Sequence, residues 1–172
     1  MKGRLVIFCG IPGSGKTTIA RLVLRSFEKS ILIQTDDVRS MLAHPNFTPE
    51  ESKFVYDACF GVAKEALKAG YVVVLDATFL KEDYRKEARA MLSRYCQRID
   101  AVWVQCNLDV ALKRNAARKA MVPPAKVQAM LDMWERPGYA IIVDSSRTSA
   151  ESAASQIVSE LDVRRSSDDG KG

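Results

Sequence analysis

The stretch that decides the fold is Leu5-Val-Ile-Phe-Cys-Gly-Ile-Pro-Gly-Ser-Gly-Lys-Thr-Thr18. It opens with a continuous apolar run, which is typical of a strand that is covered on both faces. The glycine-rich part has the spacing Gly10-x-x-x-x-Gly15-Lys16-Thr17, and apolar residues then recur at helical spacing as far as Phe27. A buried strand, a glycine-rich turn and an amphipathic helix in this order predict a phosphate-binding loop, the Walker A motif or P-loop.

The chemistry of such a loop follows from its backbone. Glycines let the chain wrap closely around an anion, so that successive N–H groups point at phosphate oxygens and the next helix adds its positive N-terminal end. Lys16 can reach the β- and γ-phosphates of a nucleotide, and the Thr17 hydroxyl can bind Mg²⁺. The residues predicted to bind ATP are Gly10, Ile11, Pro12, Gly13, Ser14, Gly15, Lys16, Thr17 and Thr18.

The rest of the chain alternates strand and helix patterns. Further strands are expected at residues 31–33, 71–76, 101–106 and 139–143, and helices at residues 35–41, 49–69, 81–94 and 124–134, around Lys113 to Arg118, and from a Thr148 cap to about residue 161. Five strands alternating with helices predict one α/β domain over residues 1–163, with a parallel sheet covered on both faces. The polar segment 164–172 is expected to be a disordered tail.

Composition excludes several classes of protein. The chain has 172 residues, 47% of them apolar, and its unbroken apolar runs reach only about five residues, so membrane proteins, fibres and disordered chains are excluded. Four cysteines without a CxxC pair and one histidine favour buried thiols and a reducing, cytoplasmic setting.

Residues 81–119 hold ten basic and five acidic side chains, and this surplus accounts for the whole net charge of +5. This stretch is either a site for a polyanion or a solvated basic face.

Acidic residues lie at the carboxyl ends of two of the predicted strands. Asp76 ends the run Val72-Val-Val-Leu75, where a carboxylate either helps to hold Mg²⁺ or caps a turn. Asp36 and Asp37 follow residues 31–33, and open α/β sheets bind ligands at the carboxyl ends of their strands. One of the two either orients an acceptor hydroxyl and accepts its proton, or caps the following helix.

Two arginines suggest a lid. Arg114 and Arg118 are four residues apart on one predicted helix, hence on one face, and Pro123-Pro124 follows them. Arginines on a mobile helical hairpin can compensate charge on a transferring phosphoryl group and exclude water.

Taken together, these motifs resemble a known group of kinases. GxPGSGK[ST]T, then Asp36-Asp37-Val-Arg39-Ser40, then Leu75-Asp76-Ala-Thr78, then Leu112-Lys-Arg-Asn-x-x-Arg118 and Val122-Pro123 resemble the kinase domain of polynucleotide 5′-hydroxyl kinases. They are also similar to O-phosphoseryl-tRNA kinases and zeta-toxin-like kinases, over residues 5 to about 161. The resemblance implies a P-loop NTPase fold with a helical lid, ATP and Mg²⁺ dependence, Asp36 as the acceptor-activating carboxylate and lid arginines at 114 and 118. It also implies acceptor contacts from Asp37, Arg39 and Thr78.

The main hypothesis is therefore an ATP- and Mg²⁺-dependent kinase whose acceptor hydroxyl is linked to RNA or DNA, as a 5′-hydroxyl end or an aminoacyl-tRNA. The rival within enzymes is a kinase for a small metabolite such as a nucleoside, a sugar or a UDP-amino-sugar. A nucleotide-dependent switch is a third possibility, weakened because neither NKxD nor DxxG occurs where a switch would need it. The 172 residues include no phosphatase, ligase or tRNA-binding domain, which leaves the acceptor open. The motifs also leave open the choice between ATP and GTP and the oligomeric state.

Overall fold

The computed structural model describes residues 3–118 and 121–169, the last five of these by their backbone alone. In this part of the chain β1 (Gly3–Cys9), β2 (Ser30–Gln34), β3 (Val72–Asp76), β4 (Cys96–Gln105) and β5 (Ile141–Asp144) form a sheet with the order β2-β3-β1-β4-β5. Every neighbouring pair is parallel. The predicted five-stranded parallel sheet is confirmed.

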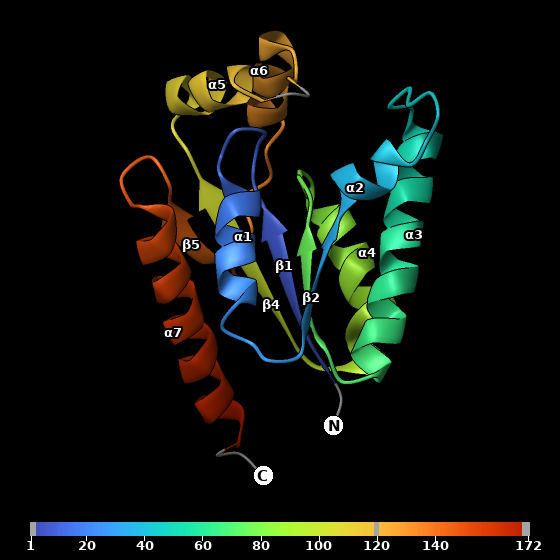
Figure 1. Ribbon diagram of the computed structural model, residues 1–172, viewed down its shortest axis with the longest axis vertical. Helices are drawn as coiled ribbons and strands as arrows, with labels where there is room; N and C mark the ends of the chain where they lie inside the picture. Colours follow the sequence, from blue (N-terminus) through green and yellow to red (C-terminus); the bar gives the residue numbers. More distant parts are fainter. Residues whose placement is uncertain (1–2, 119–120, 170–172) are drawn as a thin grey trace.

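Helices cover both faces of the sheet (Figure 1). α1 (Lys16–Leu24) and α7 (Ala150–Asp169) pack on one face, and α3 (Pro49–Lys68) and α4 (Glu82–Leu92) on the other. The central strand β1 supplies both cores, because Leu5 and Ile7 face α3 while Val6 and Phe8 face α1 and α7. All four side chains are fully buried, as the continuous apolar run predicts.

A third, smaller core lies above the carboxyl ends of the strands. There α5 (Leu108–Ala116) and α6 (Pro124–Asp132) pack against each other over the glycine-rich loop (Figure 1). Ala111 of α5 and Val127 of α6 are buried with Ile11 of that loop. The α5–α6 pair is therefore seated directly on the predicted phosphate-binding loop.

Local sequence signals set several helix ends as predicted. Thr48 caps α3 by accepting from the N–H of Glu51 at 3.2 Å, with Pro49 in the first helical position. Gly70 follows the end of α3 in the left-handed region. Asn107 caps α5 by accepting from the N–H of Asp109 at 2.9 Å. The short α2 (Thr35–Ser40) follows β2 directly, and a 3₁₀ turn (Ser93–Tyr95) follows α4.

β4 begins at Cys96, five residues earlier than predicted. This half of the strand is rich in polar residues and therefore lacks the apolar pattern that predicts a buried strand, yet Asp100 is buried there. Its carboxylate accepts from Arg4 at 2.8 Å and from Arg98 at 3.1 Å. Charge pairing with a distant residue therefore makes a polar segment compatible with a buried strand.

The final helix differs from its prediction at both ends. α7 begins at Ala150, and Ser149 rather than Thr148 accepts the capping bond, from the N–H of Ser152 at 3.1 Å. The helix runs to Asp169 instead of ending near residue 161. The disordered tail expected over residues 164–172 stays a prediction. Arg98 donates to the carbonyl of Arg164 and fastens this extension to β4. Residues 170–172 lie outside the described residues. Among the described helices, none is long and apolar enough to cross a membrane.

Candidate active site

The glycine-rich loop is shaped by close backbone approaches. Gly13 and Gly15 have φ values of 82° and 80°, a region that side chains disfavour. A Cβ on Gly13 would lie 2.1 Å from the carbonyl oxygen of Ala111, because the loop touches α5 there. The N–H of Gly10 donates to the carbonyl of Thr78 at 3.2 Å, which ties the start of the loop to the segment after β3. The loop is therefore held from both sides in the turn that the motif predicts.

Thr17 and Asp76 meet at the edge of this loop. The Thr17 hydroxyl donates to Oδ2 of Asp76 at 2.5 Å, and Asp76 is only 4% exposed. Burial raises the pKa of Asp76, while the Lys16 ammonium and the bond from Thr17 act in the opposite direction.

Oδ1 of Asp76 is also buried and has no hydrogen-bond partner. Carboxylate and hydroxyl oxygens are the ligands that Mg²⁺ prefers in proteins. An unpartnered carboxylate oxygen beside a hydroxyl therefore fits a metal held by Thr17 and Asp76, directly or through its water shell.

Asp36 lies within electrostatic range of Asp76. It lies in the first turn of α2, directly after β2, and its side chain is 67% exposed. Arg118 donates from Nη2 to Oδ2 of Asp36 at 3.2 Å. Neither Asp36 nor Asp37 caps α2, since Gln34 is the N-cap residue and no side chain makes a capping bond there. The side chain of Asp37, next to Asp36 in the chain, is exposed.

The two lid arginines do not share a helix face, contrary to the prediction. α5 ends at Ala116, so Arg118 lies beyond the helix. The buried side chain of Asn115 explains the break: its Nδ2 donates to the carbonyl of Val122 at 2.6 Å and its Oδ1 accepts from the N–H of Val122 at 3.2 Å. This amide clamp joins the end of α5 to Val122, and Arg118, just beyond the helix, reaches Asp36.

Arg114, still on α5, is fixed to a different part of the site. Its guanidinium donates to the hydroxyl and the carbonyl of Ser145 at 3.0 and 2.9 Å, and the Ser145 hydroxyl donates to the carbonyl of Ser14 at 2.7 Å. Arg114 is thus attached to the phosphate-binding loop through the residue that follows β5.

Of the remaining predicted acceptor residues, Arg39 is engaged elsewhere. Its guanidinium pairs with Glu51 and lies 4.6 Å above the Phe47 ring, so it joins α2 to the start of α3. Thr78 is half-buried, and its carbonyl serves the loop through Gly10 as described above.

Sequence reasoning missed Ser145, Asn115 and Phe47. The position of Ser145 directly after a buried strand is a usable signal, because ligands bind at that edge. Asn115 and Phe47 carry no comparable signal, since their partners are set only by the folded chain.

The basic stretch at residues 81–119 is not one surface. Arg85 is fully buried, Arg98 pairs with Asp100 beneath α7, and Arg114 and Arg118 bind Ser145 and Asp36. These four arginines therefore make contacts within the fold or the candidate site.

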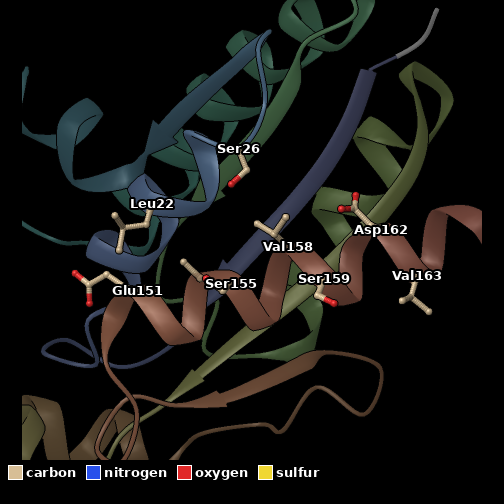
Figure 2. A pocket seen from close by; sticks show the side chains of 9 residues that line it. Leu22, Ser26, Glu151, Ser155, Val158, Ser159, Asp162 and Val163 are labelled. Atoms are coloured by element: carbon tan, nitrogen blue, oxygen red, sulfur yellow. The ribbon is translucent and has the colours of Figure 1, made fainter.

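Cavities lie at different places on the described part of the fold. One, of about 740 Å³, lies between α1 and α7; Figure 2 shows Leu22 and Ser26 on one side and α7 side chains such as Ser155 and Val158 on the other. None of the predicted site residues lines it. The second, of about 540 Å³, adjoins Ile11 and the carboxyl ends of β4 and β5, and therefore borders the phosphate-binding loop.

Comparison with known proteins identifies the family of the chain. The sequence matches the model of the AAA domain family over residues 5–137. It is 23% identical to the L-seryl-tRNA(Sec) kinase of Methanococcus maripaludis over 138 residues, which are 78% of this chain and 53% of that protein. The chain thus spans about half the length of this curated relative. A seryl-tRNA kinase falls within the group that the motifs resemble, so that resemblance is confirmed.

Solved structures agree on the fold. The structure of the Mycobacterium tuberculosis APS kinase CysC in complex with AMPPNP and APS has a TM-score of 0.74 at 18% identity, covering 94% of this chain and 98% of that one. A chain of the Pnkp1/Rnl/Hen1 RNA repair complex has a TM-score of 0.67 at 20% identity, covering 77% of this chain and 44% of that one. With a family match over most of its length and these structural neighbours, the chain belongs to the AAA domain family and has the P-loop NTPase fold.

Proposed function

We propose that the protein is a kinase that transfers the γ-phosphate of ATP, with Mg²⁺, to a hydroxyl group, and that this hydroxyl belongs to a nucleic-acid-linked acceptor such as a 5′-hydroxyl end or an aminoacyl-tRNA. The observation that carries the proposal is the contact between Asp36 and Arg118 at the carboxyl edge of the sheet, within electrostatic range of Asp76. Phosphoryl transfer requires little from a protein beyond positioning and charge compensation, and this edge offers both.

Each residue has a role in that reaction. The N–H groups of the loop and the Lys16 ammonium hold the phosphates. Thr17 and Asp76 would hold Mg²⁺, which would supply positive charge beside the phosphates of the nucleotide. Asp36 orients the acceptor hydroxyl and accepts its proton as the new O–P bond forms and the bond from the γ-phosphorus to the bridging oxygen breaks. Arg118 turns from Asp36 to the transferring group and compensates its charge.

An aromatic side chain beside this edge supports a nucleobase-bearing acceptor. Phe47 is 58% exposed, and its ring lies 4.6 Å from the Arg39 guanidinium and 4.6 Å from the Lys126 ammonium. Exposed aromatic rings combined with cations are typical of proteins that stack single-stranded bases and contact their phosphates. The sequence match to a seryl-tRNA kinase supports the same class of acceptor.

A small-metabolite kinase is the second candidate, because the APS kinase structure matches this chain with a TM-score of 0.74, against 0.67 for the RNA repair chain. Salt dependence separates the two candidates, because binding to a nucleic acid releases counterions from its phosphates and weakens steeply as salt increases. We also propose that the protein acts in the cytoplasm, in agreement with its four free thiols.

The test is transfer from γ-labelled ATP to a panel of 5′-hydroxyl oligonucleotides, seryl-tRNA, adenylyl sulfate, nucleosides and sugars. The proposal expects labelling of a nucleic acid with a KM that increases with salt, and an increase of about tenfold in that KM for Phe47→Ala. Phe54→Ala is the matched control, because Phe54 is equally exposed, at 56%. Labelling of a small alcohol alone overturns the nucleic-acid acceptor. Absence of any transfer by a protein that binds ATP overturns the kinase assignment.

A further inference from the structure

Arg85 is a cation enclosed by the fold. Its side chain is 0% exposed, and it is the largest of the fully buried side chains. Burying a charge is costly unless it is paired and every donor is hydrogen-bonded, so an arginine at such a place needs a reason that an apolar residue would not satisfy.

The contacts of Arg85 supply that reason, because they join two separate segments of main chain. Nε donates to the carboxylate of Glu82 on the same helix at 2.9 Å. Nη1 donates to the carbonyl of Phe79, in the loop between β3 and α4, and Nη2 donates to the carbonyl of Glu135 at 2.6 Å. The N–H of Glu135 also donates to the carbonyl of Leu80 at 3.1 Å, which completes the junction.

The first of these segments belongs to the nucleotide side of the site. Phe79 lies three residues after Asp76, and Thr78 between them accepts from the N–H of Gly10. Phe79 has a φ of 45°, a conformation that a bulky residue adopts only when its surroundings impose it. The bond from Arg85 to its carbonyl is one of the contacts that impose it.

The second segment is the return path from the α5–α6 pair. This pair leaves the sheet after β4 and comes back between α6 and β5, and Glu135 lies in that returning connection. Two chain connections therefore join the pair to the sheet, and Arg85 fastens the second of them to the loop that follows Asp76.

We propose that Arg85 is a positioning residue for the α5–α6 pair: it fixes the returning connection to the Asp76 loop, so that α5–α6 and its arginines close over a bound nucleotide in one defined place. Lysine cannot replace it, since a single ammonium lacks the planar fork that reaches a carboxylate and two carbonyls at once. The consequence for transfer rests on the proposed kinase function, whereas the nucleotide-induced closure does not depend on any acceptor.

The experiment compares Arg85→Gln with Arg4→Gln in the full chain. Arg4 is a matched control, because its side chain is 13% exposed and donates to Asp100 and to the carbonyl of Leu161, at the opposite end of β1. Thermal unfolding measures the stability that each variant loses. Calorimetry with Mg²⁺ and AMPPNP measures nucleotide binding, and amide exchange with and without AMPPNP measures closure over residues 108–118.

Wild type and Arg4→Gln are expected to show nucleotide-induced protection of residues 108–118. Arg85→Gln is expected to bind AMPPNP within about threefold of wild type and to lose about tenfold of that protection. If an acceptor is found, its kcat falls by about tenfold with the KM for ATP little changed. If Arg85→Gln does not fold, Arg85→Lys replaces it in the experiment. That variant is expected to lose less of the protection than Arg85→Gln but more than Arg4→Gln.

Three results overturn the proposal: no protection in wild type, full protection in the Arg85 variants, or an equal loss in Arg4→Gln. The last would mean that any destabilised variant behaves in this way. Failure to find an acceptor would count against the proposed function and would leave the exchange result unaffected.

Discussion

Arg118 donates to the carboxylate of Asp36 at 3.2 Å and thereby joins two residues that lie 82 positions apart in the chain. Without ligands, the carboxylate proposed to activate the acceptor is already occupied by the cation proposed to stabilise the transferring phosphate. The pair is partly exposed, and such pairs contribute only about 0.2–1 kcal/mol, so substrates can separate it. In the proposed reaction, the acceptor hydroxyl binds Asp36 and the γ-phosphate binds Arg118.

Asp36→Asn tests this division of labour. The amide keeps the size of the side chain but cannot accept the acceptor proton, so kcat should fall by about 10²–10⁴ while ATP affinity stays within a few-fold. Steady-state transfer kinetics and ATP titration measure the two effects. Asp37→Asn is the matched control on the same turn of α2, and loss of activity in that variant alone would assign the role to Asp37.

Gly13→Ala should abolish nucleotide binding. The added Cβ would lie 2.1 Å from the carbonyl oxygen of Ala111, a contact that backbone cannot relieve without moving the loop away from α5, and φ at this position is 82°. Gly61→Ala is the control, because nothing lies within 4 Å of its Cβ and it sits in the middle of α3. That variant should bind normally and gain about 0.5–1 kcal/mol in stability. Normal ATP binding by Gly13→Ala would contradict the close packing of the loop.

Asp76→Asn should have opposite effects on the stability of the ligand-free protein and on metal binding. Burial raises the pKa of Asp76 above its ordinary value of 3.8, so between that value and the raised one the folded protein holds a proton that the unfolded chain has released. The contribution of Asp76 to the free energy of unfolding therefore falls as the pH increases through this window. At neutral pH the buried negative charge destabilises the ligand-free protein.

Removing that charge should leave Tm unchanged or raise it at pH 7 without ligands, by roughly 2–4 °C for each kcal/mol gained. The same variant should lose the stabilisation that Mg²⁺ with AMPPNP gives the wild type. Thermal unfolding at pH 5 and pH 7 measures both effects, and the gain should be smaller at pH 5. A variant that is less stable than wild type at pH 7 without ligands would contradict the cost assigned to this carboxylate.

The parts of the fold that sequence predicts well are those set by neighbouring residues. The first strand, the glycine-rich loop and the first helix follow from a continuous apolar run and from glycine spacing, both of which are local. The start of β4 was missed because the burial of Asp100 depends on Arg4, 96 positions away. The end of α5 was missed because the side chain of Asn115 binds Val122 across a loop, which no helix propensity records.

The same distinction holds for the site. Asp76 and Asp36 were predicted as site residues because each lies at the carboxyl end of a strand, and all strands of a parallel sheet end at one edge. The contact of Asp36 with Arg118, and that of Arg39 with Glu51, depend on how α2, α3 and the loop after α5 pack together. Resemblance assigned Arg39 to the acceptor, whereas without a bound acceptor its guanidinium is engaged at the start of α3.

The last prediction concerns how Arg118 is delivered. Because Arg118 lies beyond α5 and the Asn115 clamp holds the loop that carries it, two different substitutions should impair the same step. Arg118→Ala removes the charge and should lower kcat far more than ATP affinity, and Arg118→Lys should recover only part, since lysine lacks the planar fork. Asn115→Ala leaves Arg118 intact but leaves the carbonyl and N–H of Val122 without their partner, so it should also lower kcat, with faster amide exchange in residues 115–118. Lys113→Ala, on the exposed side of α5, is the control and should change neither. If Asn115→Ala keeps full kcat while exchange accelerates, the position of Arg118 does not limit the reaction, and the clamp contributes only to the stability of the α5–α6 connection.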